Sequence, residues 1–313
     1  MWRYIVMRVL AAFPVIAVVG VVTFSLVHIA PGDPASIILG NDATPENLRE
    51  LRAYMGLDKP LPVQFAKWVG KLLQGDLGTS VFSKRSIWEE ASTRIQPTIS
   101  LAIQTVVLSS FLGISLGVIS AWQAGRPADQ ILRVFSVLGF SIPGFYLAFL
   151  LIWGFAVNLG WFGVTGYTRI QDGVLAHFHS LALAVIVNGV LGATFISRLT
   201  RSAMLEVLRE DYIRTARAKG LTEPKVYLIH AFRNASIPIV TVIGATIPAL
   251  VTGFVVTESI FAIPGLSKML LDAITHRDYA VIQGMLMVVA SGFVFMNLIV
   301  DIIYAYIDPR IRY

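Results

Sequence analysis

The residue types that most often carry out chemistry in proteins are scarce or scattered in this sequence. No cysteine occurs, so disulfides and thiolate sites are excluded. A G-x-x-x-x-G-K-[ST] phosphate loop is absent, so the chain cannot bind ATP by that route. None of the histidines belongs to H-E-x-x-H or to another compact metal-binding pattern; they are His28, His177, His179, His230 and His276. We therefore predict that the chain has no catalytic residue, no metal site and no cofactor of its own.

One serine invites comparison with an intramembrane serine hydrolase. Ser141 follows Gly139 and Phe140 inside an apolar stretch. Pro143 comes directly afterwards, and no histidine lies deep in a later apolar stretch to act as the base that a serine nucleophile needs. The sequence disfavours an intramembrane hydrolase, which stays as an alternative.

The composition is that of a membrane protein. Of the 313 residues, 56% are hydrophobic and only 14% are charged, and the mean hydropathy is +0.71. A soluble domain usually carries about 25% charged residues. Six uncharged stretches each reach the roughly 20 residues that a helix needs to cross a bilayer. The sequence predicts an all-α membrane protein, a single transmembrane domain over residues 1–313, with spans at about 9–29, 98–122, 134–158, 178–197, 236–257 and 280–304.

The first apolar stretch has the features of a retained span rather than a signal peptide. Arg3 and Arg8 precede it, as in a signal peptide. However, the apolar run exceeds the 7–15 residues typical of a signal peptide, and no A-x-A-like cleavage site follows.

The distribution of basic residues predicts the orientation. With the N-terminus inside, the cytoplasmic segments carry fourteen lysines and arginines and the short outer loops carry three. The long segment 33–94 is left out of this comparison, because long segments are translocated largely regardless of charge. We expect both termini in the cytoplasm. The basic excess then orients the chain and faces membrane lipid, so no nucleic-acid partner is needed to explain it.

Residues 33–94 are predicted to form a periplasmic cap between the first two spans. Thr44 can act as an N-cap, Pro45 can start a helix, and Gly56 can end it. A second amphipathic helix is expected over residues 62–74, ending at Gly75. We favour a role in shielding the outer rim of the bundle over a role in contacting substrate.

The apolar stretches carry polar and helix-breaking residues rather than charges at their midpoints. This pattern argues against a proton relay or a charge-coupled secondary transporter, which stays as an alternative. Polar side chains in the spans either line a wet passage or bond between helices, and prolines can kink the spans. Candidate pathway or gate residues are Ser141, Pro143, Asn188, Thr246, Thr252 and Glu258.

The cytoplasmic segment 198–235 contains a basic amphipathic helix that should stop at Gly220, followed by a second helix with Thr222 as N-cap. This arrangement resembles the docking loop of permeases of ATP-binding-cassette importers, whose pattern is Glu-Ala-Ala, three residues, then Gly. Arg214-Thr215-Ala216 replaces the Glu-Ala-Ala, a form typical of the dipeptide, oligopeptide and nickel permeases. The resemblance implies coupling to an ATPase through Arg214, Thr215, Ala216, Arg217, Ala218, Lys219, Gly220 and Leu221. We expect Ala216 and Ala218 to enter a cleft on the ATPase and the basic residues to pair with its acidic rim.

Further motifs are similar to the "B" permease of peptide importers over nearly the whole chain. They include Pro-Gly-Asp-Pro at 31–34, Gly-Asp-Leu-Gly at 75–78, Thr-Glu-Ser-Ile-Phe at 257–261 and Asp-Pro-Arg-Ile-Arg-Tyr at 308–313. The resemblance implies an importer-type permease fold in the bacterial inner membrane and a chain that is not itself an enzyme. It also implies a heterodimer with a second homologous permease, two ATPases that bind ATP and Mg, and a periplasmic or lipid-anchored binding protein. The substrate stays open among dipeptides, oligopeptides, glutathione, nickel chelates, opines and oligosaccharides.

Overall fold

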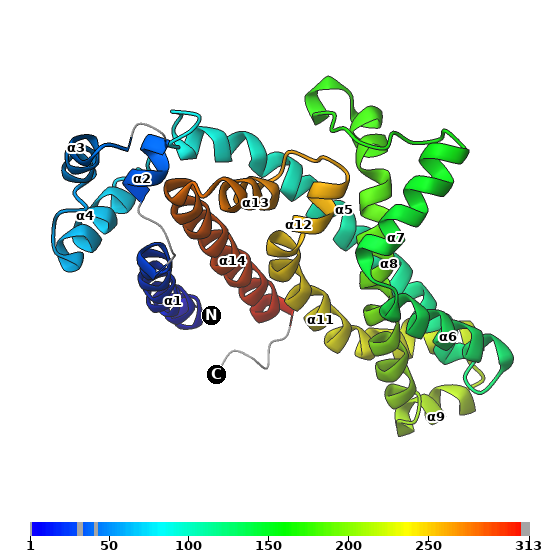
Figure 1. The fold of residues 1–313 in the computed structure, drawn as a ribbon. Coiled ribbons are helices and arrows are strands. Elements are labelled where there is room, and N and C mark those ends of the chain that lie inside the picture. The colour runs from blue at the N-terminus through cyan, green and yellow to red at the C-terminus, as the bar shows by residue number, and fades with distance from the viewer. Residues whose placement is uncertain (1, 30–33, 41–42, 308–313) are drawn as a thin grey trace. The chain divides into compact units, whose positions relative to one another are not determined.

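The described part of the chain is built from helices (Figure 1). The computed structural model describes residues 2–29, 34–40 and 43–307. Within these ranges the β-structure is limited to an isolated bridge between Thr79 and Ser86. The all-α prediction is confirmed. The residues of the motif at 31–33 and of the ending at 308–313 lie outside the described ranges.

The helices have the following bounds. The N-terminal third contains α1 (Trp2–Ile29), α2 (Pro34–Leu39), α3 (Pro45–Met55), α4 (Leu61–Leu73) and α5 (Ile87–Trp122). The middle contains α6 (Pro127–Ser141), α7 (Gly144–Leu151), the π-helix η2 (Ile152–Asn158), the 3-10 helix η3 (Ile170–Asp172) and α8 (Val174–Val207). The last part contains α9 (Asp211–Ala218), α10 (Glu223–Lys225), the π-helix η4 (Val226–Ala231), α11 (Phe232–Gly253), α12 (Val255–Ile260), α13 (Leu266–His276) and α14 (Tyr279–Ile307).

Helices long and apolar enough to cross a membrane occur where the sequence predicts spans, with one exception. In the described residues five stretches meet this condition by length and composition: Ile5–Ile29, Ile87–Trp122, Val174–Val207, Glu223–Ile247 and Tyr279–Ile303. The sixth candidate is a pair of helices, Pro127–Gly139 and Gly144–Asn158, that bend by 102°. The structure therefore supports five or six spans, and the number six and the orientation stay predictions.

The bend in the sixth candidate lies at Ile142 and Pro143. Ile142 has an extended backbone, with φ −81° and ψ 122°, because a following proline disfavours helical conformation. Pro143 then precedes α7, and its carbonyl accepts hydrogen bonds from the N–H groups of Tyr146 and Leu147. The range 134–158 is thus bent at the proline where a kink was expected, and its crossing of the membrane as one span stays a prediction.

The chain divides into two compact units, which we describe separately. One contains Pro97–Ile263 and the C-terminal part from Met296; the other contains Trp2–Gln96 and Pro264–Phe295. The prediction of one permease domain over 1–313 stays a prediction.

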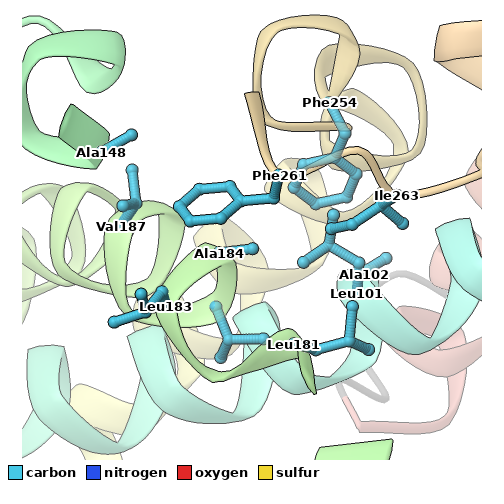
Figure 2. Close-up of a cluster of buried hydrophobic side chains, with 11 residues drawn as sticks. Leu101, Ala102, Ala148, Leu181, Leu183, Ala184, Val187, Phe254, Phe261 and Ile263 are labelled. Carbon is cyan, nitrogen blue, oxygen red and sulfur yellow. The ribbon is translucent and has the colours of Figure 1, made fainter. Parts of the chain in front are cut away.

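The first unit has two apolar clusters. In one, Phe254, Phe261 and Ile263 pack with side chains of α5, α7 and α8 (Figure 2). In the other, α9, η4 and α11 pack on α5 and α8. Glycines allow α5 to approach α8 closely: a Cβ at Gly113 would lie 2.6 Å from Ile196 Cβ, and one at Gly117 would lie 2.5 Å from Thr200 Cβ. Small residues at such positions permit two helices to pack this closely.

In the second unit, α3 forms with its predicted ends, and α4 begins and ends one residue earlier than predicted. Thr44 Oγ1 accepts a hydrogen bond from the N–H of Asn47 at 3.2 Å, and Gly56 ends α3 in a left-handed conformation with φ 73°. The Phe24 ring of α1 lies 5.8 Å from the Trp68 ring of α4. Asp278, which is buried, accepts hydrogen bonds from the Ser80 hydroxyl and the Val81 N–H, and so ties the segment before α5 to the start of α14.

Candidate functional site: helix α9 and the polar contacts of the spans

Helix α9 ends at a tight turn that depends on Gly220. Gly220 has φ 78°, the left-handed conformation predicted for it. The N–H of Gly220 donates to the carbonyl of Arg217 at 2.9 Å, and the N–H of Leu221 donates to the carbonyl of Ala216 at 3.3 Å. These two bonds satisfy carbonyls that the end of a helix would otherwise leave unpaired. The turn redirects the chain into α10, where Thr222 has the extended backbone of an N-cap but makes no side-chain cap bond.

Apolar residues fix one face of α9 to the rest of the unit. Ile213 is fully buried and Ala216 is 6% exposed, and both belong to the cluster with Val226 and Met204. Tyr212 adds a polar tie, because its hydroxyl accepts a hydrogen bond from Asn234 Nδ2 at 2.7 Å. α9 is therefore held against α8, η4 and α11 by the side opposite its charges.

This packing corrects the expected role of Ala216. We expected its small side chain to enter a cleft on an ATPase, but the methyl group points into the chain's own core. Ala216 can support α9 only from within. Ala218 is exposed, as are Thr215 and Lys219, while Leu221 is half-buried.

The arginines of α9 differ in how they are bound. Arg217 donates from Nε to Glu223 Oε1 at 2.9 Å and from Nη2 to Glu223 Oε2 at 3.3 Å, across the Gly220 turn. The hydrogen bonds that Arg217 donates to the Glu223 carboxylate raise the pKa of Arg217, so this guanidinium stays charged. Arg214 contacts Asp211 at 3.2 Å within the same helix, and both side chains are largely exposed. Arg214 and Lys219 are thus exposed to solvent, while Arg217 stabilises the turn at Gly220.

Two of the candidate pathway residues form hydrogen bonds between α12 and a neighbouring helix. Asn188 of α8 donates from Nδ2 to Thr257 Oγ1 at 3.1 Å, and the Thr257 hydroxyl is 3.2 Å from Asn188 Oδ1. Glu258 is fully buried, and its Oε1 accepts a hydrogen bond from the Thr98 hydroxyl of α5 at 2.7 Å. These contacts join α5, α8 and α12 within the first unit, so Asn188 and Glu258 bond between helices here.

The other candidate pathway residues are not brought to this place by any described contact. The Ser141 hydroxyl donates to the carbonyl of Val137 at 2.9 Å, and the Thr246 hydroxyl donates to that of Ile243 at 2.7 Å. Pro143 marks the bend between α6 and α7. The side chain of Thr252 lies outside the described side chains. A pathway role for the six residues stays a prediction.

Sequence reasoning missed a buried ion pair near the start of α6. Asp129 is buried and receives hydrogen bonds from Arg201 Nε and Nη2, each at 2.8 Å. The Ser120 hydroxyl at 2.6 Å and the Gly125 N–H at 3.1 Å complete its environment. The sequence offers only the spacing of Asp129 and Arg133, four residues apart on one helix. The 72-residue separation of Asp129 and Arg201 leaves no local signal.

Two sequence families together match most of the chain. The sequence family described as the binding-protein-dependent transport system inner membrane component matches residues 113–313, and the N-terminal family of such membrane components matches residues 1–102. The chain belongs to this permease family. It is therefore a multi-pass protein of the bacterial inner membrane and a component of an ATP-binding-cassette import system.

Relatives of this permease match along its whole length. A protein of Sinorhizobium fredii named as a probable peptide ABC transporter permease is 43% identical over 310 residues, 99% of each chain. The glutathione transport system permease protein of Salmonella paratyphi A is 40% identical over 313 residues, 100% of each chain. A solved amino acid ABC transporter shares the fold, with a TM-score of 0.51 and 12% identity, over 71% of the permease and 94% of that chain.

Proposed function

We propose that this permease forms one half of the translocation pathway of an importer for peptides or related small solutes. The observation that carries this proposal is the identity of 40–43% over essentially the full chain to permeases named for peptide and glutathione transport. These alignments cover 99–100% of this permease and of each relative.

The energy source is proposed to lie in partner subunits. The permease would pair with a second homologous permease and rest on two ATPases that bind ATP and Mg. A periplasmic or lipid-anchored binding protein would deliver the substrate. The absence of a phosphate loop from the sequence supports this division of labour.

Helix α9 is proposed to be the element that contacts an ATPase. The inner face of α9 packs into the apolar cluster that contains Ile213 and Ala216. Arg214, Ala218 and Lys219 lie on its exposed side. Because α9 is packed against the rest of the unit, a displacement of α9 by a partner is transmitted to the helices behind it. The burial of Ala216 in this cluster therefore supports the proposal.

Reconstitution tests the proposed function. Liposomes containing the permease, its partner permease, both ATPases and the binding protein should take up a labelled dipeptide or glutathione only when ATP is inside. Liposomes that lack only this permease should show no uptake, because half of the pathway is missing. The permease alone should neither transport nor hydrolyse ATP. Uptake or ATP hydrolysis by the isolated chain would overturn the proposal.

A further inference from the structure

A cationic cavity lies beside the Asp129–Arg201 ion pair, between the end of α5, the middle of α6 and the C-terminal part of α8. Its volume is about 300 Å³. Serines and arginines dominate its lining, which consists of Ser120, Arg133, Ser136, Val137, Ser197, Arg198, Arg201 and Ser202. This polar and cationic lining differs from that of the apolar clusters that hold the unit together. Neither membership of the permease family nor the proposed contact of α9 with an ATPase explains why these residues line a cavity.

The charged side chains of the described lining are arginines. Arg201 is bound in a two-pronged contact by Asp129, which neutralises it and fixes its position. Arg133 lies farther away, with Nε 3.7 Å from Asp129 Oδ1, and its side chain is 53% exposed. Arg198 is exposed as well. Three guanidinium groups thus belong to the lining: Arg201 is held by Asp129, and Arg133 and Arg198 lie on the more exposed side.

An exposed apolar strip on α6 begins at the cavity. Val137 lines the cavity and is 61% exposed, and Val134 and Leu138 beside it on the same helix are 57% and 54% exposed. Near the same end of α5, the ring of Trp122 stacks on Tyr227 with centroids 5.5 Å apart, two residues beyond Ser120. Tryptophan and tyrosine concentrate at the level of lipid headgroups. The cavity thus combines anion-binding groups with an apolar surface at one interfacial level.

We propose that this cavity binds the phosphate group of an anionic phospholipid, whose acyl chain lies along Val134, Val137 and Leu138. Guanidinium groups and serine hydroxyls are hydrogen-bond donors suited to phosphate oxygens. A free phosphate ion or a nucleotide would use the donors but would leave the apolar strip uncovered, which favours a lipid. Basic pockets between transmembrane helices are the physical form that anionic headgroup sites take.

Lipid binding to the purified permease in detergent micelles tests this proposal. Native mass spectrometry would measure the affinity for phosphatidylglycerol and for phosphatidylcholine. The double variant Arg133→Gln/Arg198→Gln should bind phosphatidylglycerol about thirtyfold more weakly, as expected for two lost headgroup contacts. The affinity for phosphatidylcholine should not change. Asp129, Arg201 and the ion pair between them stay intact in this variant.

The matched control removes the same charge from outside the cavity. Arg126 and Arg209 are exposed and do not line it. Arg126→Gln/Arg209→Gln should therefore keep the affinity for phosphatidylglycerol. Equal weakening by both double variants would show a diffuse charge effect and overturn the proposal, as would unchanged binding in Arg133→Gln/Arg198→Gln.

A second arm separates lipid from free anion. Equilibrium dialysis with inorganic phosphate should show no binding at concentrations where phosphatidylglycerol saturates. Val137→Asp puts a carboxylate where the apolar strip meets the cavity. This variant should bind phosphatidylglycerol more weakly than the unmodified permease. Tight binding of inorganic phosphate, with phosphatidylglycerol unable to compete, would assign the cavity to a soluble anion and contradict the lipid proposal.

Discussion

Asp129 is a buried carboxylate whose hydrogen bonds come from three separate segments. Arg201 belongs to α8, Ser120 to α5, and Gly125 to the loop between α5 and α6. A buried charge is tolerated only when its partners replace the water that it has lost. The ion pair therefore fixes the start of α6 against its neighbours, which also shapes the cationic cavity.

Asp129→Asn should destabilise the permease markedly. The change leaves Arg201 without its counter-charge, and we expect a loss of about 3 kcal/mol, the lower end for a broken buried pair because Arg201 keeps some access to water. Asp211→Asn is the matched control, since it also removes an aspartate paired with an arginine, but at an exposed site. Thermal unfolding in detergent should show a large decrease in midpoint for the first variant and almost none for the second. Similar midpoints for both would refute the role given to Asp129.

At the scale of elements, the close approach of α5 and α8 limits what can replace their glycines. A Cβ at Gly117 would lie 2.5 Å from Thr200 Cβ and 2.6 Å from the carbonyl oxygen of Ser197. Backbone cannot move aside as a flexible side chain can, so these two helices would have to separate. Gly292 in α14 has no atom within 4 Å of such a Cβ.

Gly117→Ala should therefore destabilise the permease, at a cost of about 1–3 kcal/mol for overpacking. Gly292→Ala makes the same chemical change in open space and should be neutral or slightly stabilising, since alanine favours helix over glycine. The fraction of monodisperse protein that survives heating, followed by size-exclusion chromatography, compares the two. Equal survival would mean that α5 and α8 are not packed as closely as described.

Elements were more predictable than their contacts. Thr44, Pro45 and Gly56 predicted the bounds of α3, and Gly220 predicted the end of α9, because caps are written in adjacent residues. The bend at Pro143 was foreseen only as a kink, since a proline shows that a helix is interrupted and not by what angle. The Thr98–Glu258 contact joins residues 160 positions apart, and the burial of Ala216 depends on α8 and η4, so neither has a local signal.

At the scale of the whole molecule, the asymmetry of basic charge predicts which loops lie in the cytoplasm. The positive-inside rule counts basic residues in short loops. It predicts that α9 lies in the cytoplasm and that the cap lies in the periplasm. The sequence contains no cysteine, and a single introduced thiol therefore reports its own location.

Asp58→Cys in the cap should react with an impermeant maleimide in intact spheroplasts, because Asp58 is exposed and is expected to face the periplasm. Lys219→Cys at the end of α9 should react only after the membrane is opened. Labelling in the reverse order would invert the orientation and remove α9 from reach of a cytoplasmic ATPase.

In the proposed importer, α9 transmits the energy of ATP hydrolysis from the partner subunits to the permease. Gly220 and Gly56 offer a matched pair, since both end a helix in the left-handed conformation and both have open space where a Cβ would lie. A valine at either position adds about 1–2 kcal/mol of backbone strain, but only Gly220 orients the proposed ATPase contact.

The most direct measurement is therefore ATP-driven uptake, with substrate-stimulated ATP hydrolysis, by the reconstituted importer carrying Gly220→Val or Gly56→Val. We predict that Gly220→Val lowers both by roughly tenfold, as strain of this size would shift a docking equilibrium, while the permease still inserts and pairs. Gly56→Val should leave both near the unmodified rate. Normal uptake and normal ATPase stimulation in Gly220→Val would contradict the account.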